Sequence, residues 1–114
     1  MQVAQETLDA QTRAVTVVGE LVGSSGARLM RMVQQALDDD VERLLIDLTA
    51  MTFMDSGGLA ALIAAWSATV ERKGRFAVVL APESHAQRSL ELRGVADVFA
   101  VAATREAALA LLGG

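Results

Sequence analysis

One stretch decides the fold of this chain: Thr52-Phe53-Met54-Asp55-Ser56-Gly57-Gly58-Leu59. A continuous apolar segment, Leu44-Leu45-Ile46-Asp47-Leu48, precedes it and is typical of a strand buried on both faces. Apolar residues recur at helical spacing directly after it, which predicts a helix over residues 56–72. The stretch therefore joins a buried strand to a helix and places the Ser56 hydroxyl beside the Asp55 carboxylate at the start of that helix.

The start of this helix suits an anion. The N–H groups of a first helical turn have no partners within the helix and carry partial positive charge, so phosphate is stabilised there. We therefore interpret Ser56 as a phosphoacceptor, although a helix-capping hydroxyl is the ordinary role of serine at such a place. Asp55 is interpreted either as a cap or as a group that orients the Ser56 hydroxyl. Gly57 and Gly58 are interpreted either as a strained turn or as an opening for a partner's backbone.

Length and composition exclude several classes of protein. The chain of 114 residues predicts one domain over residues 1–114, and the absence of cysteine excludes a disulfide framework or a thiol nucleophile. The net charge is −4 and the ten Lys and Arg residues are scattered along the sequence, which argues against nucleic acid as a partner. No apolar run reaches the length of a membrane span, and the acidic N-terminus does not read as a signal peptide. We expect a soluble, cytoplasmic domain.

The rest of the sequence alternates between strand and helix patterns. Strands are predicted at residues 5–8, 14–18, 43–48, 75–80 and 98–101, and helices at 27–37, 56–72, 82–92 and 104–112. Loops are expected at Gly23-Ser24-Ser25-Gly26 and at the acidic triplet of residues 38–40. Such alternation predicts an α/β fold, with a small, mixed, mostly parallel sheet of four to five strands flanked by about four helices.

The chain resembles a STAS domain, and in particular the free-standing bacterial anti-sigma factor antagonists. The resemblance is carried by Gly19-Glu20-Leu21, by Leu45-Ile46-Asp47-Leu48, by Phe53-Met54-Asp55-Ser56 with Gly58-Leu59, and by Leu92-Arg93-Gly94-Val95. In that family the serine after the aspartate is phosphorylated by a partner that is both an ATP-dependent kinase and an anti-sigma factor. The unphosphorylated antagonist binds this partner and frees the sigma factor.

The resemblance implies a protein-binding domain that is switched by phosphorylation of Ser56, not an enzyme, and that holds no metal or cofactor. Its expected partners are an anti-sigma factor kinase and a phosphatase, and it is expected to be a monomer or weak dimer. Two positions depart from the family pattern: Gly57 stands where Ser or Thr is usual, and Val22 where Asp is common. The expected partner-binding residues are Glu20, Leu21, Val22, Ser24, Ser25, Met54, Asp55, Gly57, Gly58, Ala60 and Ala61.

Three other functions compete with this one. A non-switching STAS subunit of a larger assembly, such as a stressosome-like scaffold or a lipid-transport complex, is the main alternative. A serine hydrolase is disfavoured because nothing marks His85, the sole histidine, as a base held by an orienting acid. Nucleotide binding at the glycines is disfavoured because the lysine of a P-loop is missing.

Overall fold

The chain begins with an antiparallel hairpin. In the computed structural model, which describes residues 2–82, 84 and 99–113, β1 (Gln2–Asp9) pairs with β2 (Thr12–Leu21). The Asp9 carboxylate accepts a hydrogen bond from the Gln11 amide at 2.8 Å and fixes the turn between them. The two strands predicted here are thus confirmed, and both are longer than predicted.

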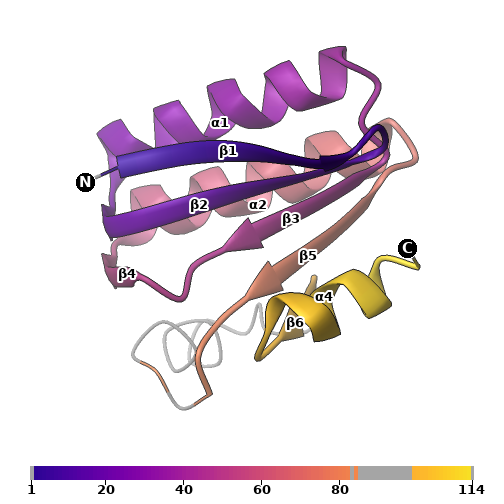
Figure 1. Cartoon of the computed structure of the whole chain (residues 1–114). Coiled ribbons are helices and arrows are strands. Elements are labelled where there is room, and N and C mark those ends of the chain that lie inside the picture. The colour runs from indigo at the N-terminus through magenta and orange to yellow at the C-terminus, as the bar shows by residue number, and fades with distance from the viewer. Residues whose placement is uncertain (1, 83, 85–98, 114) are drawn as a thin grey trace.

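The remaining elements complete a mixed sheet with helices on both faces (Figure 1). They are α1 (Gly23–Asp38), β3 (Arg43–Asp47), β4 (Met51–Met54), α2 (Ser56–Glu71), β5 (Arg75–Val79), β6 (Ala100–Ala102) and α4 (Arg105–Leu111). The strand order is β1-β2-β3-β5-β6, and every pair except β1–β2 is parallel. The predicted α/β class is confirmed. The described residues form three helices, and the helix predicted over residues 82–92 lies almost entirely outside them.

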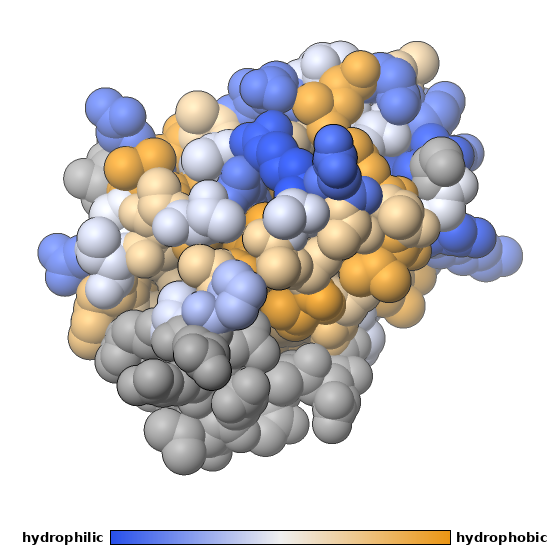
Figure 2. Space-filling model, turned by 60° about the horizontal axis from the view of Figure 1, so that its bottom comes forward, coloured by the Kyte–Doolittle hydropathy of each residue, from blue (hydrophilic) through white to orange (hydrophobic). Residues whose placement is uncertain are grey.

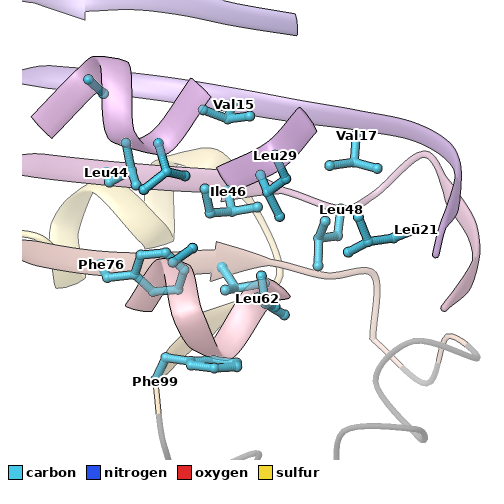
Figure 3. Packing of buried hydrophobic residues seen from close by; sticks show 14 of the residues in the cluster. Val15, Val17, Leu21, Leu29, Leu44, Ile46, Leu48, Leu62, Phe76 and Phe99 are labelled. Atoms are coloured by element: carbon cyan, nitrogen blue, oxygen red, sulfur yellow. The ribbon is translucent and has the colours of Figure 1, made fainter. Parts of the chain in front are cut away.

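The larger core fills the space between the sheet and the pair α1 and α2 (Figure 3). Alternate strand residues point into it because successive strand side chains face opposite sides. Its buried members include Val15, Val17, Leu21, Leu29, Leu44, Ile46, Leu48, Leu62 and Phe76. Phe76 also packs edge-to-face on Phe99, with ring centroids 5.7 Å apart. Met30, Met32, Met51 and Trp66 are partly buried at the rim of this core.

A smaller core lies on the opposite face, under α4. Ala14, Leu45, Ala77 and Val79 of the strands pack there against Ala108 and Leu112. The Thr104 hydroxyl caps α4 by accepting a hydrogen bond from the Ala107 amide at 3.1 Å. Leu111 at the end of α4 is 55% exposed, and hydrophobic patches reach the surface on the side that Figure 2 brings forward.

The structure corrects the prediction of a loop over residues 23–26. Val22 is the last extended residue, and α1 begins at Gly23. The Ser25 hydroxyl accepts a hydrogen bond from the Val22 amide at 2.8 Å, which satisfies a backbone group at the helix start. Gly26 faces α2 so closely that an added Cβ would lie 2.8 Å from the Ala61 Cβ. Small residues here belong to helix packing rather than to a loop.

Two further expectations differ from the structure. The sequence pattern does not predict β4. The first half of β2 pairs with β3, and its last residues, beyond the end of β3, pair with β4. The helical period places Val70 in the buried stripe of α2, but Val70 is 46% exposed. Thr69 is buried instead. Its hydroxyl donates a hydrogen bond to the Ala65 carbonyl at 2.8 Å and is therefore satisfied without water.

Candidate functional site

The helix start at Ser56 is capped by its neighbour. Asp55 is extended, with φ −100° and ψ −175°, and its carboxylate accepts a hydrogen bond from the Gly58 amide at 2.8 Å. This is the geometry of an N-cap residue. The capping role considered for Asp55 is therefore confirmed, and the one considered for Ser56 is wrong. Ser56 is the first residue of α2 and is exposed to solvent.

Gly58 is fixed by close packing. A Cβ added at Gly58 would lie 1.9 Å from the Leu21 carbonyl oxygen, a distance that no side chain tolerates. The interpretation of Gly58 as an opening for a partner is therefore wrong, because the residue is buried against β2. Gly57 differs, because it is exposed. A Cβ added there would lie 3.1 Å from the Gly23 Cα on α1 and 3.3 Å from the Asp55 carboxylate, so the starts of α1 and α2 lie side by side.

The expected partner-binding residues divide into three groups by exposure. Glu20, Ser24, Gly57 and Ala60 are exposed, and Val22, Asp55 and Ala61 are half-buried. Leu21, Ser25, Met54 and Gly58 are buried, so their side chains cannot touch a partner. Leu21 and Met54 lie in the larger core, and the Ser25 hydroxyl also donates to the Glu20 carbonyl at 2.8 Å. These four residues position the surface around Ser56.

Phe53 joins this surface, although it is not among the expected partner-binding residues. It is 43% exposed on β4, where it pairs with Glu20 of β2. The alternation of side chains along a strand was the available signal, because Met54 next to it points into the core. We use the name Ser56 face for the exposed residues Glu20, Ser24, Phe53, Ser56, Gly57 and Ala60.

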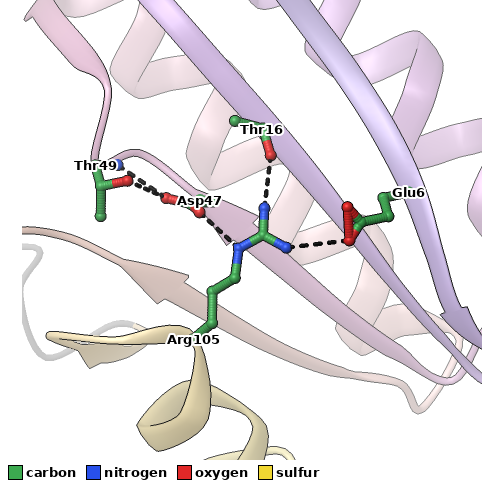
Figure 4. A network of polar contacts seen from close by, with 5 residues as sticks. All are labelled: Glu6, Thr16, Asp47, Thr49 and Arg105. Carbon is green, nitrogen blue, oxygen red and sulfur yellow. Dashed lines mark hydrogen bonds and ion pairs between the residues drawn. The ribbon is translucent and has the colours of Figure 1, made fainter.

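A polar network on the opposite face of the sheet holds the turn that leads from β3 to β4 (Figure 4). The Arg105 Nε donates to one oxygen of Asp47 at 2.8 Å, and the Thr49 amide and hydroxyl donate to the other at 3.0 and 2.7 Å. Arg105 also donates to the Thr16 hydroxyl at 2.9 Å and pairs with Glu6 at 3.3 Å. One side chain of α4 thereby ties three strands together.

The network sets the charge state of Asp47. Desolvation raises the pKa of its carboxyl, but the hydrogen bonds from Thr49 and Arg105 outweigh burial and hold the pKa below its ordinary value. The hydrogen bond to Asp47 raises the pKa of Arg105. Burial of Arg105 acts in the opposite direction but is the smaller effect. The pair therefore stays ionised at neutral pH. The sequence feature that could have indicated this network is an aspartate, Asp47, inside an otherwise apolar strand.

Other kinds of site find little support. Within residues 2–82, 84 and 99–113, no group of three or more His, Asp or Glu side chains is placed to hold a metal ion. His85, considered above as a base, lies outside the described residues. Among the helices that the structure describes, none is long and apolar enough to cross a membrane.

The fold and this surface define the class of the protein. The family model of the STAS domain matches residues 3–108, and the chain belongs to that family. No curated protein matches the chain.

Solved structures show the same fold. An anti-sigma factor antagonist from Mycobacterium paratuberculosis is 26% identical and superimposes with a TM-score of 0.85, over 99% of this chain and 94% of that one. The antagonist SpoIIAA in its unphosphorylated form is 19% identical, with a TM-score of 0.75 over 99% of both chains. The phosphorylated form of Bacillus SpoIIAA is 20% identical, with a TM-score of 0.70 over 96% of this chain and 97% of that one.

Proposed function

We propose that this protein is an anti-sigma factor antagonist whose binding to an anti-sigma factor kinase is switched by phosphorylation of Ser56. The observation that carries the proposal is the exposure of Ser56 at the first position of α2, with the cap supplied by Asp55. The hydroxyl is thus available for chemistry without loss of the cap. The solved forms of SpoIIAA, one unphosphorylated and one phosphorylated, support the proposal by similarity of fold.

The transfer itself needs little from this chain. The kinase moves the γ-phosphoryl group of ATP to the Ser56 oxygen: an O–P bond forms there, the bond between the β and γ phosphates breaks, ADP leaves and the hydroxyl proton is released. The amides of the first turn of α2 then lie close to the new phosphate. The Gly58 amide is already engaged by Asp55, so the remaining donors are those of Ser56 and Gly57.

The phosphate acts on the interface rather than on the fold. The Ser56 face carries the aromatic ring of Phe53. It also carries Gly57 and Ala60, whose small size suits a closely packed partner. Phosphorylation of Ser56 adds a charge of about −1.5 to −2 to this surface. Burying that charge against an uncharged partner surface is unfavourable, so the phosphorylated protein releases the kinase.

The test uses purified protein, the cognate anti-sigma factor kinase and ATP. Intact-mass measurement should show the addition of one phosphate to the wild-type chain and none to Ser56→Ala. Ser67→Ala is the matched control, because Ser67 is a partly exposed serine of the same helix that lies outside the Ser56 face, and its loss should leave phosphorylation intact. The absence of phosphate from the wild-type chain, together with unchanged kinase binding by Ser56→Asp, would favour a non-switching STAS subunit of a larger assembly instead.

A further inference from the structure

A second site lies at the other end of α2, about 24 Å from Ser56 for a helix of 16 residues. A pocket of about 380 Å³ opens there, at the amino ends of β3 and β5. Basic side chains dominate its wall. The lining residues are Glu42, Arg43, Arg72, Lys73, Arg75 and Gly113.

The charge of this pocket is opposite to that of the whole chain. The chain carries a net charge of −4, yet four of its ten basic residues line the pocket. Two carboxylates offset them: Glu42 in the wall, and Asp38, which pairs with Arg72 at 2.8 Å. Asp9 also interacts electrostatically with Arg43, and Asp40 lines a neighbouring hollow that shares Glu42 and Arg72 with the pocket. The wall of the pocket itself still carries four basic side chains against one carboxylate. Basic residues that are scattered along the sequence are thus gathered in part by the fold.

Helix ends explain only part of the cluster. Cations are favoured near helix C-termini, and Arg72 follows this rule because it donates to the Leu37 carbonyl at the end of α1, at 2.8 Å. Arg75 follows the rule as well, because it bonds the carbonyl of Leu112, the C-cap residue of α4, whereas Arg43, the first residue of β3, serves no helix end. They contact neutral oxygens, the Thr12 hydroxyl at 3.4 Å and the Leu112 carbonyl at 3.2 Å. Among the described residues, neither pairs with a carboxylate.

Lys73 stands in a backbone conformation that favours glycine. Its φ is +62°, and it follows the cap residue Arg72, where helices commonly place a glycine. Gly74 comes one residue later. A lysine thus occupies a strained position on the rim of the pocket. The helix end does not require its charge, since glycine would close the helix without strain.

We infer that this pocket binds a small anion that carries two or more phosphate charges, such as the diphosphate of a nucleotide or of a phosphorylated metabolite. Guanidinium groups match phosphate oxygens with two parallel hydrogen bonds, and three of them surround the pocket. Its volume lies within the range of small-molecule sites. The wall carries four basic side chains against one carboxylate, which favours such an anion. The site is distinct from the Ser56 face and does not depend on the proposed switch.

The test is calorimetric titration of the wild-type protein with inorganic pyrophosphate at low salt, with Lys73→Gly as the decisive variant. We expect saturable binding that is at least fivefold weaker in Lys73→Gly, while the melting temperature of this variant stays equal or rises because strain is removed. Arg28→Gln is the matched control: Arg28 is exposed on α1, away from this pocket, and its loss makes the same change in charge. Its affinity for pyrophosphate should equal that of the wild type.

Titration followed by amide NMR locates the site and identifies the ligand class. Shifts of the Glu42 and Gly74 amides would support the inference, and tighter binding of ATP than of pyrophosphate would assign the site to nucleotides rather than to other diphosphates. Binding of inorganic phosphate should be weaker than either. The inference is overturned if pyrophosphate does not bind saturably, if Arg28→Gln weakens binding as much as Lys73→Gly, or if the shifts centre on Gly57.

Discussion

The two ends of α2 present opposite chemistry. At its amino end, the helix start is exposed beside two carboxylates, Glu20 on β2 and Asp55 at the cap, and it offers the backbone amides of Ser56 and Gly57 rather than basic side chains. At its carboxyl end, arginine and lysine side chains surround a pocket. Backbone groups depend on close packing to keep their position, whereas charged side chains depend on their electrostatic balance. Substitutions at the two ends should therefore fail in different ways: packing changes at the first, charge changes at the second.

The largest effect is expected at Gly58. Gly58→Ala places a Cβ 1.9 Å from the Leu21 carbonyl oxygen, so the start of α2 must move away from β2. Overpacking of this severity should lower the free energy of unfolding by about 3 kcal/mol, measured by urea denaturation. Gly23→Ala is the matched control, since a Cβ there meets nothing within 4 Å and should change stability by less than about 0.5 kcal/mol. Equal effects at both glycines would contradict the packing role of Gly58.

The next effect concerns the network that holds the turn before β4. Arg105→Ala removes the cation bonded to Asp47 and should lower the free energy of unfolding by about 2 kcal/mol at pH 7. Glu6→Gln is the control, because Glu6 contacts Arg105 only at the surface and should change stability by less than about 1 kcal/mol. A larger loss of stability in Glu6→Gln than in Arg105→Ala would contradict the view that the bond between Arg105 and Asp47 is the main stabilising contact of the network.

The same network predicts a dependence on pH. Because the pKa of Asp47 is lowered in the fold, its stabilising contribution is complete above the unfolded-state pKa of about 3.9 and is lost as the pH falls through the folded-state value. Urea denaturation between pH 7 and pH 3 should therefore show a smaller loss of stability in Arg105→Ala than in the wild type. Parallel curves for the two proteins would mean that Arg105 does not hold the pKa down.

The smallest effect on stability separates Asp55 from Ser56. Asp55→Ala removes the cap and should lower the free energy of unfolding by about 1 kcal/mol. Ser56→Ala should change it by less than about 0.5 kcal/mol, because the exposed hydroxyl carries no cap. Thermal denaturation of both variants checks this ranking. A larger loss of stability in Ser56→Ala than in Asp55→Ala would mean that Ser56 caps the helix. Its hydroxyl would then be less available to accept a phosphoryl group.

Local patterns predicted most of the fold. The period of α2 and the apolar run of β3 are properties of neighbouring residues, so both could be read from the sequence. β4 could not, because its place is defined by where β3 stops along β2. The site divides in the same way. The exposure of Ser56 followed from a local motif, but the burial of Ser25 depends on hydrogen bonds that form only once α1 has begun at Gly23.

Long-range contacts account for what the sequence could not predict. Asp47 and Arg105 meet although 58 residues separate them, and no periodicity relates the two positions. The basic pocket is similar: Arg43 and Arg75 adjoin because β3 and β5 are neighbouring parallel strands in register. Charges that are scattered along a sequence can thus be gathered by sheet topology, which is why composition gave no sign of this pocket.

The most direct measurement is phosphosite mapping by tandem mass spectrometry of this protein after reaction with the cognate kinase and ATP. The proposed switch predicts a single phosphate on Ser56 and at least tenfold weaker kinase binding by that species, with an unchanged melting temperature. A phosphate on another residue, or a Ser56-phosphorylated protein that binds the kinase as tightly as before, would contradict it.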